Sequence, residues 1–416
     1  MLRLSVFLSM LYLVQCIQYK NNVCLSLNDY KTIYRNKNCS YNPDVLSSPK
    51  LIARRYGYPL ETITVTTKDR YILTLHRIPK SANSKSDENV RRPPILMFHG
   101  VGGSSAFYML QGKRSLGFYL SDHGYDVWLG NWRGNLYSNK HVNYSTSSLK
   151  YWNFGFHEMA IYDLPACIDL IANRTGEKGN LIYVGHSMGT TVSYIYSSLM
   201  RKHAEENLKS IISLAPVAFM GNIKGSFKLL APFVPLFRTI LNLKGFYAIG
   251  HVIGFQRALL PLVCGSYPFI NICNILLLSS VGLSEKEYQP ELLPIFFSYF
   301  PSGISVKTLE HYSQIISSNG RFQMYDFGPA GNLQKYNQST PPEYDLSEIS
   351  VPVHLFVGSE DLIGDSKDAD ILQEKLCLGK SHLSAVKHTF PYAHNDFFLG
   401  KDLKPFQDVF LRVVLS

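Results

Sequence analysis

A pentapeptide at residues 185–189, Gly-His-Ser-Met-Gly, carries a side chain suited to covalent chemistry. Its serine, Ser187, lies between two glycines. The apolar run 181–184 before it is typical of a buried strand, and residues 190–201 after it are typical of a helix. A strand, this glycine-flanked serine and a helix form a nucleophile elbow, a tight turn that lifts Oγ above a sheet. We therefore predict that Ser187 is a nucleophile.

A serine nucleophile needs a base that takes its proton and an acid that orients the base. In chains with such an elbow the order is serine, acid, histidine. The acid candidate is Asp361, which follows the strand predicted at 351–357. The base candidate is His394, which follows the last predicted strand, 384–390, whereas His388 lies inside that strand and is interpreted as structural. Three nearby acids are alternatives to Asp361, although surface or helix-capping positions suit them better: Glu360, Asp365 and Asp368.

An attacking serine also creates an oxyanion, which two backbone N–H groups usually stabilise. One donor belongs to the residue after the nucleophile, here Met188. The other is expected in the loop after an early strand, and the strand 94–98 is followed by His-Gly-Val-Gly-Gly. We predict that the N–H of Val101 is this second donor. A backbone donor places no demand on the side chain, so methionine and valine are both acceptable.

Short apolar strands alternate with helical stretches around these residues. Residues 63–67 and 71–76 are predicted to form a hairpin, and helical stretches are predicted at 156–172 and 190–201. Such alternation is typical of an α/β protein with a mainly parallel sheet. The remaining predicted strands are 94–98, 125–129, 181–184, 211–214, 351–357 and 384–390.

The alternation stops after residue 218 and returns near residue 346. The intervening segment is rich in aliphatic and aromatic residues, yet none of its runs reaches the ~20 residues that span a bilayer. We interpret it as a mostly helical cap and lid inserted into the α/β core, with an ordinary second domain as the alternative. The predicted organisation is a signal peptide at 1–16, an N-terminal segment at 17–50, core at 51–218, cap and lid at 219–345, and core at 346–416.

The N-terminus has the pattern of a secretory signal peptide. Arg3 precedes an apolar run from Leu4 to Val14, and small residues permit cleavage after Cys16. A membrane anchor or an N-terminal core helix is the alternative. Asn-x-Ser/Thr triplets are glycosylated only in proteins that pass through the secretory route, and the chain has four such triplets. Their asparagines are Asn38, Asn143, Asn173 and Asn337.

Six cysteines remain after this cleavage, and sequence alone cannot choose among their pairings. Local spacing favours Cys264 with Cys273, because Gly265 and Pro268 interrupt a helix between them. Two reduced, buried thiols are the alternative. The other cysteines are Cys24, Cys39, Cys167 and Cys377.

Composition excludes several classes of protein. The 416 residues are 46% hydrophobic and 17% charged, which is incompatible with a disordered chain. The net charge of +10 comes from scattered basic pairs without a recognition motif, so no nucleic-acid partner is predicted. The pair His157-Glu158 lacks the second histidine of a zinc site, and the glycines at 100–103 lack the lysine of a phosphate loop. We predict no metal and no cofactor.

With these residues in place, the chain resembles the acid lipase family, which includes gastric lipases, lysosomal acid lipases and many insect relatives. The resemblance runs from about residue 52 to the C-terminus. It depends on the following motifs: Tyr56-Gly-Tyr-Pro59, Asp69-Arg-Tyr-Ile-Leu73, His99-Gly100, Gly124-Tyr-Asp-Val-Trp128, Gly130-Asn-Trp-Arg-Gly-Asn135, Tyr162-Asp-Leu-Pro-Ala166, Gly185-His-Ser-Met-Gly-Thr190, Leu214-Ala-Pro-Val-Ala218 and Tyr392-Ala-His394.

The resemblance implies an α/β-hydrolase core with a cap and lid, and hydrolysis of neutral lipid esters, triacylglycerols or cholesteryl esters. It places Ser187, Asp361 and His394 on the family's triad positions, and Val101 and Met188 on its oxyanion positions. Cys264 and Cys273 match the family's cap disulfide. Two single residues depart from the pattern, because the family usually has glutamine at Met188 and serine at Trp132. The segment 358–366, Gly-Ser-Glu-Asp-Leu-Ile-Gly-Asp-Ser, also departs from the family's Gly-Gly-Asn-Asp-x-x-Ala-Asp-Pro.

The expected partner is a lipid ester at a lipid–water interface, met by a monomer through peripheral membrane contact. The expected location is extracellular, with the lysosomal lumen as the alternative. A short-chain carboxylesterase and a non-catalytic lipid-binding homologue are the alternative functions.

Overall fold

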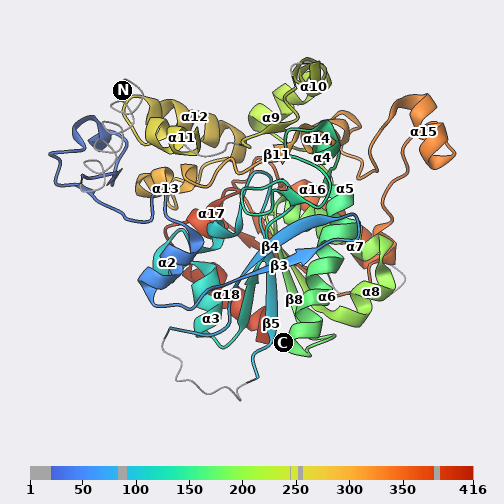
Figure 1. Ribbon diagram of the computed structural model, residues 1–416, viewed down its shortest axis with the longest axis horizontal. Helices are drawn as coiled ribbons and strands as arrows, with labels where there is room; N and C mark the ends of the chain where they lie inside the picture. Colours follow the sequence, from blue (N-terminus) through green and yellow to red (C-terminus); the bar gives the residue numbers. More distant parts are fainter. Residues whose placement is uncertain (1–19, 83–90, 244, 252–255, 379–384, 416) are drawn as a thin grey trace.

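The computed structural model describes residues 20–82, 91–243, 245–251, 256–378 and 385–415. The predicted signal peptide, 1–16, and most of the polar stretch 83–92 lie outside these residues. A central sheet has helices on both faces, and further helices lie beyond one end of its strands (Figure 1).

The central sheet has nine strands. The order of eight of them is β13-β12-β9-β8-β5-β6-β4-β3, and β7 pairs with β4. The strands from β13 to β6 are parallel to their neighbours, whereas β3, β4 and β7 pair antiparallel at one side. The predicted α/β class and mainly parallel sheet are confirmed. The strand bounds are β3 Glu61–Thr66, β4 Tyr71–Ile78, β5 Pro94–Phe98, β6 Asp126–Leu129, β7 Lys140–His141, β8 Leu181–His186, β9 Leu208–Leu214, β12 Val353–Gly358 and β13 Ala385–Phe390.

Strand β5 is apolar at every position because both of its faces are buried. Leu96 and Phe98 belong to the buried cluster on one face of the sheet, whereas Ile95 and Met97 belong to the cluster on the other face. Because successive side chains point to opposite faces, a strand covered on both sides needs apolar residues at every position.

Helices cover both faces of the sheet. One group packs on the face that carries Phe98: α5 Phe156–Glu158, α6 Leu164–Thr175, α7 Met188–Leu199, α8 Arg201–Asn207 and α16 Ser366–Cys377. The other group packs on the face that carries Met97: α2 Pro49–Tyr56, α3 Leu116–Asp122, α17 Asp396–Leu399 and α18 Lys404–Leu415. A π-helical turn at Met159–Asp163 joins α5 to α6, within the helix predicted at 156–172. The short α4 spans Leu149–Trp152.

The segment between β9 and β12 is mostly helical. Its helices lie above the carboxyl ends of the parallel strands (Figure 1). Their bounds are α9 Gly225–Leu230, α10 Val234–Leu243, α11 Gln256–Cys264, α12 Phe269–Val281, α13 Leu293–Phe297, α14 Val306–Ser317 and α15 Gly328–Tyr336. Two short strands, β10 Ala248–Ile249 and β11 Ile304–Ser305, pair with one another.

Within the described ranges, no helix combines the length and the apolar character needed to cross a membrane.

The described residues contain two disulfides. Cys264 in α11 is bonded to Cys273 in α12. Cys24 is bonded to Cys39, joining the two-residue strands β1 Val23–Cys24 and β2 Cys39–Ser40, a pairing that the sequence left open. The other two cysteines in the described part of the chain are free thiols, Cys167 and Cys377.

Candidate active site

Ser187 lies on a sharp turn between β8 and α7. Its φ is 52°, a left-handed conformation that costs a non-glycine residue energy. The flanking glycines have no room for a side chain. A Cβ on Gly185 would lie 2.6 Å from the carbonyl carbon of Gly189, and a Cβ on Gly189 would lie 2.6 Å from the carbonyl oxygen of Phe98. The glycines thus permit the close packing that holds the serine in place.

Side chains from three separate segments meet at this turn. Nε2 of His394 lies 2.8 Å from Oγ of Ser187, and Nδ1 of His394 lies 2.8 and 3.0 Å from the two carboxylate oxygens of Asp361. A carboxylate only accepts, so Nδ1 carries the proton and Nε2 is free to accept from the serine hydroxyl. The structure thus brings together all three side chains that the sequence predicted as nucleophile, base and acid.

Asp361 is held by the loop that follows β12. Its Oδ1 accepts from the backbone N–H groups of Ile363 and Gly364 at 2.8 and 2.9 Å. Asp361 as a whole is only 3% exposed, and this burial strengthens the electrostatic effect of its carboxylate on the imidazole. The three alternative acids are occupied elsewhere: Glu360 is exposed, Asp365 caps α16, and Asp368 accepts from Asn222.

His394 lies in the loop after β13. Its own backbone is held from two sides, because its N–H donates to the carbonyl of Val281 at 3.2 Å and its carbonyl accepts from Nε2 of His186 at 2.8 Å. His388 lies within β13, where its ring stacks beside that of His354. The structure therefore keeps His388 apart from the serine.

The two predicted oxyanion donors lie on segments that adjoin the serine. Met188 begins α7, so its N–H has no acceptor one turn earlier in the helix and lies at the positive end of the helix dipole. Val101 follows Gly100, whose Cβ, if it had one, would lie 3.3 Å from Oγ of Ser187. These positions favour both residues as donors.

The loop that contains Val101 is supported by side chains. The indole N–H of Trp132 donates to the carbonyl of His99 at 2.9 Å, and its ring stacks on Phe98 with centroids 3.7 Å apart. Nδ1 of His99 lies 2.8 Å from the carbonyl oxygen of Gly100. Trp132 was noted in the sequence only as a departure from a family pattern. Its supporting contact joins loops distant in the chain and leaves no signal in a local motif.

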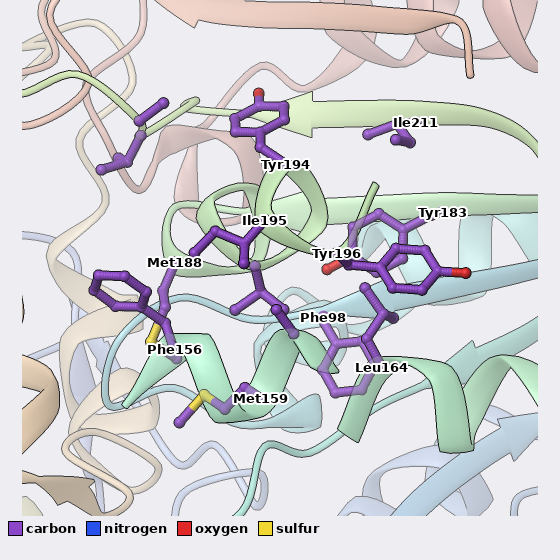
Figure 2. Packing of buried hydrophobic residues seen from close by; sticks show 14 of the residues in the cluster. Phe98, Phe156, Met159, Leu164, Tyr183, Met188, Tyr194, Ile195, Tyr196 and Ile211 are labelled. Atoms are coloured by element: carbon purple, nitrogen blue, oxygen red, sulfur yellow. The ribbon is translucent and has the colours of Figure 1, made fainter. Parts of the chain in front are cut away.

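Met188, the other departure, has a buried side chain. It lies among the apolar residues beneath the site, together with Phe156 (Figure 2). The environment is therefore suited to a thioether, and the side chain takes no part in the polar contacts of the site.

Two further histidines near the serine are neutral. Burial lowers the pKa of His99 to about 4 and that of His186 to about 3. Among these three imidazoles, His394 is the one with a hydrogen-bonding contact to Oγ of Ser187. Among the described residues, no group of three or more potential ligands is placed to hold a metal ion.

Comparison with known proteins places the chain in a family. Residues 93–401 match the family described as "alpha/beta hydrolase fold", and residues 50–112 match the "partial alpha/beta-hydrolase lipase region". Gastric triacylglycerol lipase from Bos taurus is 38% identical over 377 residues, covering 90% of this chain and 91% of its own. The Homo sapiens protein of that name is 36% identical over 377 residues, with the same coverage, 90% and 91%. Lipase member K from Homo sapiens is 34% identical over 372 residues, 89% of this chain and 90% of its own.

Solved structures agree on the fold. A bacterial membrane phospholipase A superposes with a TM-score of 0.50 at 16% identity, covering 100% of both chains. The α/β hydrolase GrgF from Penicillium sp. sh18 superposes with a TM-score of 0.50 at 13% identity, covering 86% of this chain and 98% of its own. The resemblance seen in the sequence motifs is confirmed, and the chain belongs to the α/β-hydrolase lipase family that includes the gastric triacylglycerol lipases.

Proposed function

We propose that this protein is a secretory-pathway serine lipase that hydrolyses neutral lipid esters, triacylglycerols or cholesteryl esters, to free fatty acids. The observation that carries the proposal is the continuous chain of hydrogen-bonding contacts from Ser187 through His394 to Asp361. The names of the relatives support ester lipids as the substrate class.

The proposed reaction has two halves. His394 takes the proton of Ser187, and Oγ attacks the ester carbonyl. The N–H groups of Val101 and Met188 hold the oxyanion, a stabilisation of about 3–4 kcal/mol per donor. The alcohol leaves with the proton from His394, and water repeats the sequence to release the fatty acid. Asp361 orients the imidazole throughout.

The helices above the sheet support a lipid substrate. Many large apolar side chains in residues 227–276 are exposed, although such residues are usually buried. A surface of this kind is typical of membrane or partner contact, and we propose peripheral contact with a lipid–water interface. We call it the apolar cap surface and define it by Leu229, Phe233, Leu236, Phe246, Ile275 and Leu276, which are 54–73% exposed.

Surface features support passage through the secretory route. All four asparagines of the predicted glycosylation triplets are exposed: Asn38, Asn143, Asn173 and Asn337. The two disulfides also suit an oxidising compartment. We propose a secreted monomer, with lysosomal delivery as the alternative. Enzymatic deglycosylation of the protein from a secretory host should lower its mass, and size exclusion should give the mass of one chain.

The decisive experiment uses the purified glycoprotein and its Ser187→Ala variant. A fluorophosphonate probe should label the parent and leave the variant unlabelled. Emulsified triolein and soluble p-nitrophenyl butyrate should both be hydrolysed, with triolein turnover rising as the interface area increases. Labelling with hydrolysis of the soluble ester alone would indicate a short-chain carboxylesterase. Absence of labelling would indicate a non-catalytic lipid-binding protein.

A further inference from the structure

His186 precedes the serine and donates a hydrogen bond to the backbone of the base. It is the last residue of β8, its side chain is buried, and its Nε2 lies 2.8 Å from the carbonyl oxygen of His394. A carbonyl oxygen only accepts, so Nε2 of His186 carries the proton and Nδ1 is bare.

The ring of His186 is fixed by its surroundings. It packs edge-on against Phe398, with centroids 4.9 Å apart, and its centroid lies 5.0 Å from that of His394. Nδ1 is buried and has no hydrogen-bond partner among the described residues. A Cβ on Gly100 would lie only 3.1 Å from this nitrogen. One ring thus adjoins the serine turn, the oxyanion loop and the loop of the base.

The protonation state of His186 agrees with this geometry. Burial, together with the neighbouring His394 and His99, lowers its pKa to about 3, although the hydrogen bond to the carbonyl of His394 acts in the opposite direction. A neutral imidazole provides one N–H, which is the number of donors the carbonyl of His394 needs. It also adds no positive charge that would oppose protonation of His394 during the reaction.

We propose that His186 is a positioning residue, whose Nε2–H holds the backbone of His394 so that its imidazole bridges Ser187 and Asp361. This inference rests on the proposed function. The other backbone contact of His394 is longer, 3.2 Å to Val281, and comes from the end of α12. The bond from His186 comes from the central sheet, so the core itself sets the position of the base.

Three substitutions separate the donor from the ring. In His186→Gln the amide nitrogen reaches as far as Nε2 and keeps a donor. In His186→Asn the amide ends near the depth of Nδ1, and in His186→Phe the ring remains without a donor. The count of active sites comes from exhaustive fluorophosphonate labelling, and kcat per labelled site and KM are measured on p-nitrophenyl butyrate.

His186→Asn and His186→Phe should lower kcat per labelled site by about 10²-fold and leave KM unchanged, because small displacements of a catalytic group have effects of this size. His186→Gln should keep most of the parent's rate.

His311 provides the matched control. It is 1% exposed, its Nε2 lies 2.9 Å from the carbonyl oxygen of Gln323, and burial also lowers its pKa to about 3. The same substitutions at His311 should lower the melting temperature without changing kcat per labelled site.

The proposal is wrong if folded His186→Asn and His186→Phe keep the parent's kcat per site, or if His186→Gln loses as much as His186→Asn. It is also wrong if every His186 variant misfolds while the His311 variants fold. If only His186→Phe misfolds, the comparison of His186→Gln with His186→Asn tests the proposal, since these two side chains differ in length and not in polarity. Failure of the proposed function looks different, because Ser187→Ala would then be as active as the parent.

Discussion

The sheet beneath the serine and the helices above it use apolar residues in opposite ways. In β5, Leu96 and Phe98 are 0% exposed, whereas Leu229 in α9 and Leu276 in α12 are 73% and 64% exposed. The sequences of the two regions are similarly apolar. The difference shows that apolar content serves two purposes here. The apolar residues of the sheet fill a core beneath Ser187, whereas those of the apolar cap surface are exposed to solvent.

This division has a measurable consequence. Substitutions in the buried relay should slow the hydrolysis of every ester alike, since the chemistry is common to all of them. Substitutions on the apolar cap surface should affect only esters that are met at an interface.

The largest effect is expected for Ser187→Ala. Loss of the nucleophile should lower kcat by about 10⁶-fold on both soluble and emulsified esters. Ser193→Ala is the control, because Ser193 is buried in the same helix and its Oγ donates only to the carbonyl of Thr190. If Ser187→Ala kept a rate well above the level left by a loss of about 10⁶-fold on either substrate, the assignment of Ser187 as nucleophile would be contradicted.

Asp361→Asn should lower kcat by about 10⁴-fold on both substrates, because an amide at this position favours the wrong tautomer of His394. Asp365→Asn removes a neighbouring carboxylate that caps α16 and should keep the parent's rate. Pre-steady-state acylation with p-nitrophenyl butyrate measures the step directly. Equal rates for the two variants would place the orienting acid elsewhere.

The double variant Leu229→Ser with Leu276→Ser should lower turnover of emulsified triolein by about tenfold, because each lost apolar contact weakens binding to the interface. Hydrolysis of p-nitrophenyl butyrate should stay unchanged. The matched control is Leu378→Ser with Leu415→Ser, two leucines that are 71% and 68% exposed outside the cap. A loss of turnover on p-nitrophenyl butyrate, or an equal loss of triolein turnover in the control variant, would contradict the distinction between the buried sheet and the apolar cap surface.

The smallest effect is expected where the two regions meet. Burial, helped by the carboxylates of Glu287 and Asp361, raises the pKa of Asp396 to about 7, against the opposing effects of the backbone N–H of Ala393 and the nearby His394. The folded state therefore binds more protons than the unfolded state between pH 3.8 and 7, so this group's contribution to stability is lost as pH rises. Asp396→Asn should raise the free energy of unfolding at pH 7.5 by about 1–3 kcal/mol and change it little at pH 4. Chemical denaturation at both pH values tests this, and an equal shift at both would contradict it.

The central elements could be predicted because buried strands leave a strong local signal. Residues 94–98 were predicted as a strand and are β5, since every side chain there meets a covered face. The chain order of residues around an elbow likewise predicts Asp361 and His394 as acid and base. Helix α7 begins at Met188, earlier than the predicted Thr190, because the glycine motif itself forms its first turn.

Other features depend on contacts between distant parts of the chain. The hydrogen bond from His186 to His394 joins residues 208 positions apart, so no local pattern could assign it. The pairing of Cys24 with Cys39 depends on the register of β1 against β2, which spacing does not define. The π-helical turn at Met159–Asp163 likewise interrupts a stretch whose periodicity is simply helical.

The order of the relay along the chain controls when activity can arise. Ser187 is synthesised 207 residues before His394, and β12 pairs with β9 only after the whole intervening helical segment has been made. A growing chain therefore carries the serine without its base while the 207 residues up to His394 are made. In the proposed mechanism ester cleavage needs His394, so a translation product that ends before β13 should be inert toward lipid esters.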